Sequence, residues 1–361
     1  MTYPSPSDYQ DALQFPEDVF ADPLLAAGTP VPGPLGLPRL LTGAFAAVFP
    51  VDTAEGRKAI RCFLSDAPER RRRAEALAAH LRERPLEAFV PFAYQERGLR
   101  IGRQVLPIVV MDWVEGEGLG RYVARHHAEP ATLAALAEAW TRLVDELAQA
   151  RVAHGDLQPG NVLVQAHDGE PRLVLVDYDA AVVPALVGRP VPEAGHRHFQ
   201  HPERGDAPAD LSLDRFAALV VLTALEALQE APALWARYDT GENLLFTAED
   251  FFAPERSPLF AELQALPRVR PLAAALAAAC YLPPDRTPTL GEARRGAVPA
   301  VRARTRRSGP REPVRRAGFA RWAAPVLAAA LALALLASLV QPAAGAAALA
   351  GAAVALAAWG A

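Results

Sequence analysis

Apolar positions in residues 133–149 recur at intervals of three and four. In LAALAEAWTRLVDELAQ the leucines, the tryptophan and the valine share one face, which predicts an amphipathic helix. The stretch HGDLQPGN follows at residues 154–161, and its glycines and proline indicate a turn that ends the helix. Residues 162–164 and 173–176 are short β-rich runs with a polar stretch between them, which predicts a small hairpin.

Three oxygen-bearing side chains lie in the predicted turn and at the end of the predicted hairpin. Asp156 and Asn161 lie in the turn, and Asp177 follows the second β-rich run directly. A carboxylate without a partner is costly in a core, so these residues indicate a site. Divalent cations prefer such hard oxygen ligands, and phosphoryl transfer needs them together with one positioned base. For any one of the three residues alone, an Asx-turn without a ligand is the alternative.

The composition is that of a folded protein without a disulfide framework. Of 361 residues, 51% are hydrophobic and 22% are charged, which is too apolar for a disordered chain. The two cysteines, Cys62 and Cys280, exclude a disulfide framework and a CxxC metal site. The first twenty residues carry acids and prolines in place of a basic, apolar leader, so we expect a cytoplasmic main domain.

The charge changes sharply near the C-terminus. Residues 296–321 contain eight arginines and one glutamate among Pro, Gly and Ser, which is a linker composition with a formal charge of +7. Because the whole chain carries −4, residues 1–295 carry −11. We expect no nucleic-acid partner for so acidic a domain.

Residues 322–361 contain no ionisable side chain. Within them, residues 323–340 form an apolar run of 18 residues. At about 1.5 Å per residue, such a helix nearly crosses a hydrocarbon layer of roughly 30 Å. A break around Pro342 precedes a second apolar stretch, so one or two transmembrane helices are predicted, with a buried core helix as the alternative. The preceding arginines favour an inner or plasma membrane location with the main domain cytoplasmic.

The helix, the HGDLQPGN turn, the hairpin and the final VDYD together resemble the catalytic core of the protein kinase superfamily, whose pattern is HRDxxxxN followed by DFG. The resemblance implies an α+β fold of two lobes, a small β-rich N-lobe and a large α-helical C-lobe, that uses ATP and Mg²⁺. In this frame Asp156 orients the acceptor hydroxyl and accepts its proton, while Asn161 and Asp177 hold Mg²⁺. Gln158 stands where a lysine normally contacts the γ-phosphate.

HGDLQPGN is also similar to the HGDLHPGN of small-molecule kinases of the aminoglycoside phosphotransferase kind. The downstream sequence favours the protein kinase branch, in which an APE-like motif, a buried aspartate and a late arginine follow. Pro202 and Glu203 match the end of that motif, and Asp214 matches the buried aspartate. Arg286 then matches the arginine that pairs with the glutamate.

Three histidines, in HRHFQH, precede Pro202. His196, His198 and His201 are candidate metal ligands by residue type. In the kinase frame they lie in the activation segment, where a substrate docks, and we expect no zinc site there.

The segments LLTGAFAAVFPV and RKAIRCFL resemble the glycine-loop hairpin of a kinase and the strand that carries its ATP lysine. Gly43 matches the middle glycine and Val48 the valine over the adenine. The other two glycines of the loop are replaced, which implies a thinner cover over the phosphates. Period-two alternation puts Ala59 and Arg61 on one face of the next strand, so Arg61 takes the place of the lysine.

The next stretch, RRRAEALAAHL, resembles the regulatory helix of the N-lobe. Glu75 is the predicted partner of Arg61, and Glu69 is the second candidate. An ordinary surface ion pair of either glutamate is the alternative.

The segment IVVMDWVEGEGL resembles the strand and hinge that join the two lobes. Met111 is the expected gatekeeper beside the adenine. The backbone at Asp112 and Val114 is expected to hydrogen-bond the adenine. A strand leading into a polar turn is the alternative.

The resemblance covers residues 36–295 and is closest to a bacterial, eukaryotic-type subgroup in which arginine at the ATP-lysine position is usual. Five parts of the chain are expected in consequence. They are an N-terminal extension (1–35), a kinase N-lobe (36–114), a kinase C-lobe (115–295), a basic linker (296–321) and a membrane segment (322–361).

Two functions are compatible with these residues. The first is a membrane-tethered kinase that transfers the γ-phosphate of ATP to a hydroxyl of a protein substrate, with serine or threonine favoured over tyrosine. The second is a pseudokinase, a nucleotide-binding scaffold. The intact Asp156, Asn161 and Asp177 favour catalysis, whereas Arg61 and Gln158 favour the scaffold. The sequence leaves the substrate and the oligomeric state open.

Overall fold

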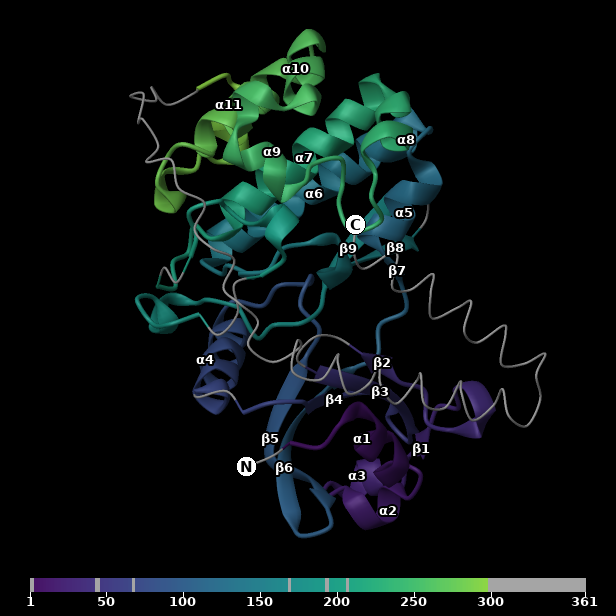
Figure 1. Cartoon of the computed structure of the whole chain (residues 1–361). Helices are drawn as coiled ribbons and strands as arrows, with labels where there is room; N and C mark the ends of the chain where they lie inside the picture. Colours follow the sequence, from purple (N-terminus) through teal and green to yellow (C-terminus); the bar gives the residue numbers. More distant parts are fainter. Residues whose placement is uncertain are drawn as a thin grey trace, which may run out of the picture. The chain divides into compact units, whose positions relative to one another are not determined.

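The structure, a computed structural model, describes residues 3–42, 46–66, 69–167, 170–191, 195–205 and 208–297. These residues form a β-rich lobe followed by a larger, mainly helical lobe, drawn in purple to blue and in teal to green in Figure 1. The predicted α+β, two-lobed architecture is confirmed for this part of the chain. The predicted membrane segment lies outside the described residues.

The N-lobe is built on a six-stranded sheet. Its path order is β1-β3-β4-β6-β5, and β2 also pairs with β3. The strands are β1 (Thr29–Pro30), β2 (Leu41–Thr42), β3 (Ala46–Thr53), β4 (Gly56–Phe63), β5 (Phe92–Ile101) and β6 (Gln104–Asp112). Between β4 and β5, α4 (Arg70–Glu83) crosses beside the sheet (Figure 1). Residues 113–116 then connect β6 to the C-lobe.

The strands β3 and β4 have two different faces. On one face Phe49 and Ile60 are fully buried in the hydrophobic core of the N-lobe. On the other face lie Val48, Ala59 and Arg61, which alternate with these core residues along the strands. They line the cleft that separates the lobes. The strand period therefore separates core residues from cleft residues as predicted.

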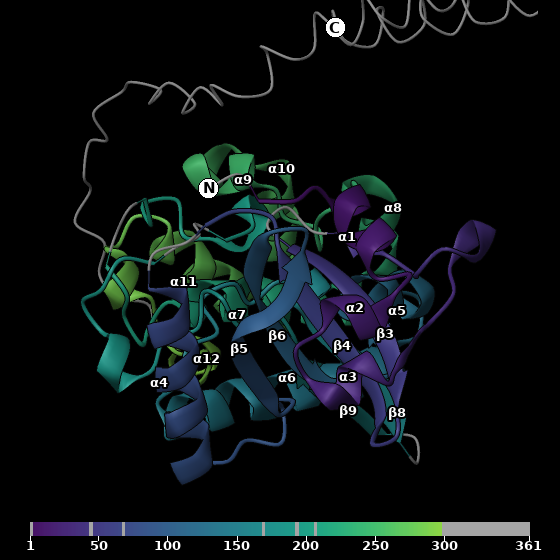
Figure 2. The ribbon, with the colours of Figure 1, turned by 90° about the horizontal axis from the view of Figure 1, so that it is seen from below.

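The N-terminal residues pack against the face of the sheet that is turned away from the cleft. They form three short helices, α1 (Pro6–Ala12), α2 (Pro16–Val19) and α3 (Pro23–Ala26), each with proline in its first turn. Tyr9 and Leu13 are fully buried in the same core as Phe49, and the Tyr9 hydroxyl donates to the Phe63 carbonyl at 2.7 Å. Figure 2 shows the three helices lying over the sheet. The segment predicted as an extension thus supplies part of the N-lobe core.

The C-lobe packs around one buried helix. In α7 (Asp214–Glu230) almost every side chain is buried, and the helix lies against α6 (Pro130–Ala150) and α11 (Arg270–Ala279). A small sheet of order β7-β8-β9 lies at the edge of the lobe that faces the cleft. Its strands are β7 (Glu117–Gly118), β8 (Val162–His167) and β9 (Glu170–Leu175). The remaining helices are α5 (Leu119–His126), α8 (Trp235–Tyr238), α9 (Ala248–Phe252), α10 (Pro258–Ala265) and α12 (Leu290–Arg294).

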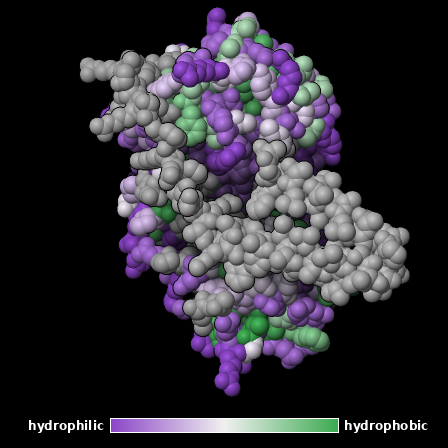
Figure 3. Space-filling view, in the orientation of Figure 1, coloured by the Kyte–Doolittle hydropathy of each residue, from purple (hydrophilic) through white to green (hydrophobic). Residues whose placement is uncertain are grey.

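The visible surface of the described residues is mostly hydrophilic on both lobes, with small separate hydrophobic patches (Figure 3). Within the described ranges, no single helix has both the length and the apolar character needed to cross a membrane. In the part of the chain that the structure describes, one pair, α7 with residues Pro232–Tyr238, meets that requirement together, and it is bent by 118°.

The packing of α1 gives a test of the N-terminal segment. Leu13→Ala removes a fully buried side chain and should lower the free energy of unfolding by about 2–5 kcal/mol. Phe15→Ala is the matched control, because Phe15 is 59% exposed and its loss should cost less than about 0.5 kcal/mol. Denaturant unfolding of both variants measures the difference. Equal stability of the two variants would contradict this packing.

Candidate active site between the lobes

A cleft of about 970 Å³ lies between the two lobes. The sheet strands β3, β4 and β6 form its N-lobe wall, and the loop after α6 and the end of β9 form its C-lobe wall. Most residues predicted to bind nucleotide or metal line this cleft: Val48, Ala59, Arg61, Met111, Asp112, Val114, Gln158, Asn161 and Asp177. Gly43 lies outside the described residues. Residues far apart in the sequence thus share one cavity.

The HGDLQPGN loop is held against the buried helix α7. The carboxylate of Asp214, the first residue of α7, accepts the backbone N–H of His154 at 2.5 Å and that of Gly155 at 2.8 Å. Asp214 is buried, and burial raises the pKa of its carboxyl group. The buried aspartate predicted from the sequence therefore anchors the loop by its backbone.

Gly155 meets a steric requirement of this loop. Its φ of +80° lies in the left-handed region, where glycine carries no penalty. A Cβ atom at this position would lie 2.3 Å from the carbonyl oxygen of Ala180. Ala180 belongs to the segment that follows Asp177, so the residue that replaces the arginine of HRD lets these two segments approach closely.

Asp156 is not among the residues that line the cleft, but it contacts two residues that do. Its Oδ2 accepts from the Asn161 amide nitrogen at 3.0 Å, and its Oδ1 accepts the His196 backbone N–H at 2.8 Å. Asn161 and His196 both line the cleft. Because the side-chain nitrogen of Asn161 is directed to Asp156, the side-chain oxygen of Asn161 is the atom suited to a cation.

Gln158 shapes the turn between Asp156 and Asn161. Its side-chain oxygen accepts the Gly160 N–H at 2.8 Å and caps the 3₁₀ turn η2 (Pro159–Asn161). Gln158 also lines the cleft, so it lies in the region where the sequence places a phosphate contact.

Arg61 joins two carboxylates of the VDYD segment. Its Nη1 lies 2.5 Å from Asp177 Oδ1, and its Nη2 lies 2.9 Å from Asp179 Oδ2. Arg61 is only 7% exposed. Burial raises the pKa of the Asp179 carboxyl group, and the Arg61 guanidinium opposes that shift. Asp177 has a φ of 64°, a backbone conformation that aspartate tolerates better than most residues and that often marks functional sites.

The predicted pairing of Arg61 with Glu75 is wrong. Glu75 is an exposed residue of α4 that pairs with Arg71 at 2.7 Å, one helical turn away. The second candidate, Glu69, pairs with Arg72 and Arg189. The face of α4 that turns to the cleft carries Arg73, so a carboxylate of this helix does not meet Arg61.

Arg73 is a site residue that the sequence analysis missed. It is buried, and its guanidinium donates to the backbone carbonyls of Asp179 at 3.2 Å, Ala181 at 2.9 Å and Pro190 at 3.2 Å. Burial lowers the pKa of Arg73. Its position two residues before Glu75, within a run of four arginines, gave no signal that singled it out.

Tyr178 fixes the same segment from the other side. Its hydroxyl accepts the Val90 N–H at 2.9 Å and donates to the Leu175 carbonyl at 2.7 Å. Its ring packs against Phe89 and Phe92. Burial raises the pKa of the Tyr178 hydroxyl, so it stays protonated and able to donate.

The rings of His196 and His198 contact each other, and each of the three histidines also has a partner of its own. The backbone of His196 binds Asp156, the His198 ring accepts the Ala248 N–H at 2.8 Å, and the His201 ring contacts the Ala279 carbonyl at 2.9 Å. Among the residues that the structure describes, no group of three His, Cys, Asp or Glu side chains is placed to hold a metal ion.

The predicted pairing of Glu203 with Arg286 is also absent. Both residues are exposed, and no ion pair joins them in the described part of the chain. The neighbouring Arg204 is buried instead and donates to the Gly155 carbonyl at 2.6 Å. The arginine that contacts the HGDLQPGN loop therefore comes from the segment just after the three histidines.

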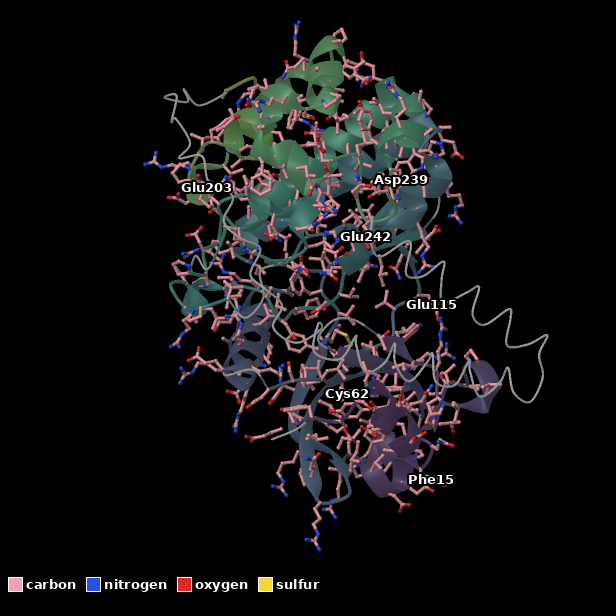
Figure 4. All side chains as sticks on the ribbon, viewed as in Figure 1. Phe15, Cys62, Glu115, Glu203, Asp239 and Glu242 are labelled. Carbon is pink, nitrogen blue, oxygen red and sulfur yellow. The ribbon has the colours of Figure 1, made fainter. Side chains whose placement is uncertain are left out.

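The C-lobe rim of the cleft carries acidic residues that the sequence analysis also missed. Asp239 and Glu242, between α8 and α9, line the cleft together with Glu115 from the hinge. Figure 4 labels these three side chains, with Glu115 at the level of the hinge and the other two on the C-lobe. No sequence motif marks the segment after α8, because its place at the cleft depends on how the C-lobe folds.

Comparison with known proteins finds a similar family and a similar solved structure. A model of the lipopolysaccharide kinase (Kdo/WaaP) family matches residues 61–185, from Arg61 through Asp177. The match covers about a third of the chain and shows that this segment is similar to that kinase family. Among solved structures, the Mycobacterium tuberculosis PknI kinase domain is similar, with a TM-score of 0.44 and 19% identity over 72% of this chain and 92% of that one. A search of curated proteins gives no match. The family match supports phosphotransferase activity.

Gly155 offers a test of the loop geometry. Gly155→Ala should destabilise the protein by more than the roughly 1–2 kcal/mol of a left-handed backbone penalty, because its Cβ would overlap Ala180, and it should also weaken ATP binding. Gly188→Ala is the matched control, since Gly188 has a φ of +82° and open space around the added Cβ. Thermal unfolding and nucleotide titration compare the two variants. If both behave alike, the close approach to Ala180 is not a constraint.

Proposed function

We propose that this kinase-like protein transfers the γ-phosphate of ATP to a serine or threonine hydroxyl of a protein, with Asp156 as the base. One observation carries the proposal. Asp156 contacts Asn161, and Asn161 and Asp177 both line a cleft that Arg61 lines from the N-lobe. A scaffold has no chemical need for all three oxygen-bearing side chains at one place.

The nucleotide would lie between the sheet of the N-lobe and the C-lobe floor. Val48 and Ala59 form an apolar roof for the adenine, and the hinge backbone at Asp112 and Val114 offers hydrogen bonds to its edge. The Asp112 side chain is directed elsewhere, to Lys58 at 2.7 Å. Arg61 supplies positive charge to the phosphates as a planar fork with several donors.

Asn161 and Asp177 fit Mg²⁺ because both present hard oxygen atoms to the cleft. When bound, Mg²⁺ neutralises phosphate charge and orients the γ-phosphoryl group. Asp156 orients the acceptor hydroxyl and takes its proton. The hydroxyl oxygen then forms the new bond to the γ-phosphorus, and the bond to the ADP oxygen breaks. The acceptor must first reach Asp156 Oδ1, which the His196 N–H occupies in this structure.

Charge supports a protein acceptor. Residues 1–295 carry a formal charge of −11, and the exposed Asp239 and Glu242 lie at the mouth of the cleft. Such a surface attracts cationic segments and repels anionic ones over distances of about 10 Å. A serine or threonine within a basic segment suits it better than an anionic glycolipid does.

A sugar hydroxyl is the second candidate acceptor. The match to the lipopolysaccharide kinase family favours it, since that match spans the whole catalytic segment. The two acceptors can be separated by offering the protein both a basic serine- and threonine-containing peptide mixture and a lipopolysaccharide preparation.

We also propose that the C-terminal segment tethers the kinase domain to the cytoplasmic face of the membrane. The support is the apolar run at 323–340 and the arginines that precede it. Fractionation of cells that express the whole chain or a chain ending at residue 297 would test the tether.

Removal of the base tests the catalytic assignment. In the full chain, Asp156→Asn should lower the rate of phosphate transfer by about 10²- to 10⁴-fold and leave ATP affinity nearly unchanged, because the base acts on the acceptor. Asp285→Asn, at an exposed position of the C-lobe, is the control. Radiolabelled ATP with Mg²⁺ and both acceptors measures transfer. Transfer that persists in Asp156→Asn would overturn the assignment, and ATP binding without transfer in the unaltered chain would select the pseudokinase.

A further inference from the structure

Arg61 pairs with two aspartates that differ in their exposure to solvent. The Arg61 side chain is 8% exposed and that of Asp179 is 17% exposed, whereas that of Asp177 is 40% exposed. A buried carboxylate needs a lasting partner, because leaving it unpaired is strongly destabilising. Asp177 can exchange its partner for water or a cation at much lower cost.

In protein kinases, a glutamate of the N-lobe helix pairs with the residue that binds the ATP phosphates. Here α4 does not supply that glutamate, because Glu75 is directed to Arg71 on the exposed side. The helix contributes Arg73 instead, whose guanidinium binds the carbonyl of Asp179 itself. The helix therefore acts on Arg61 through Asp179 and not through a carboxylate of its own.

Asp179 is held in a way that suits this role. Arg73 binds the carbonyl of Asp179 and that of Ala181, and the ring and hydroxyl of Tyr178 fix the residue before it. The Asp179 side chain thus has a defined place opposite Arg61 Nη2. The second nitrogen of the fork, Nη1, is the one that contacts Asp177.

We propose that Asp179 is the residue that positions Arg61 for the nucleotide, in place of a glutamate from α4. In the proposal, which rests on the function proposed above, Arg61 keeps Asp179 and releases Asp177 when nucleotide and Mg²⁺ bind. Asp179 is a positioning residue, because it acts through Arg61. Without it, Asp177 is the remaining counter-ion of Arg61 in the VDYD segment and is held back from the cation.

The test measures nucleotide binding rather than turnover. Fluorescent ATP is titrated into the full chain at a series of Mg²⁺ concentrations. Asp179→Asn should weaken ATP affinity and raise the Mg²⁺ concentration for half-saturation, each by about 10- to 100-fold, as loss of a supporting residue commonly does. Glu75→Gln is the matched control and should change neither value by more than about two-fold, since its ion pair is exposed. Asp179→Glu, which keeps the charge, should recover part of the loss.

A double-mutant comparison separates positioning from general damage. In the Arg61→Gln background, adding Asp179→Asn should cause little further loss of ATP affinity, because the residue that Asp179 positions is gone. The proposal would be overturned if Asp179→Asn lowered ATP affinity as much in the Arg61→Gln background as in the unaltered chain. It would also be overturned if Glu75→Gln lowered ATP affinity as much as Asp179→Asn does. If the unaltered chain binds ATP with Mg²⁺ but transfers no phosphate, the proposed function fails while these affinities still decide the role of Asp179. If it binds no nucleotide, both proposals fail.

Discussion

The cleft depends on the hydrogen bonds that the buried carboxylate of Asp214 accepts. Two backbone N–H groups, from His154 and Gly155, donate to it from the catalytic loop. Hydrogen bonds to a charged group contribute about 1.5–3 kcal/mol each, more than bonds between neutral groups. Because α7 is buried over almost its whole length, its first residue offers these acceptors at a fixed point. Asp156 and Asn161, which follow Gly155 within six residues, take their positions from that anchor.

Two arginines connect the lobes through one short segment. Arg61 from β4 and Arg73 from α4 both bind atoms of residues 177–181, and Arg73 also reaches Pro190. The N-lobe therefore contacts the segment that carries Asp177 at several points. Movement of α4 relative to the C-lobe would change the backbone of that segment. The relative position of the two lobes and the geometry of the site are in this way linked by the same contacts.

The sequence predicts the parts of the site that depend on local patterns. The HGDLQPGN turn follows from glycine and proline chemistry, and the cleft face of β4 follows from strand alternation, so Ala59, Arg61 and Asn161 lie where expected. The partner of Arg61 could not be predicted in the same way. Asp177 and Asp179 lie more than 100 residues away, and the choice between them and Glu75 depends on the rotation of α4.

Two other differences between the sequence-based predictions and the structure also result from tertiary packing. Arg204, one residue after the predicted Glu203, supports the catalytic loop, and nothing local distinguishes a buried arginine from an exposed one. The helices of residues 6–26 supply core side chains such as Tyr9, although their sequence is rich in proline and acids. Burial of these residues is decided by tertiary packing, which a pattern of neighbours along the chain does not encode.

The departures of this site from the usual kinase pattern are linked by charge. The carboxylate of Asp179 would repel phosphates if no cation were paired with it. The guanidinium of an arginine is larger than a lysine ammonium, and its planar fork suits two partners better than one. Together they compensate, because the guanidinium has two terminal nitrogens and meets Asp177 and Asp179 at the same time. A lysine ammonium is a single point of charge and does not offer this planar fork. Arg61 and Asp179 therefore form one charge-balanced unit with Asp177, and α4 contributes no carboxylate to it, since Glu75 pairs with Arg71.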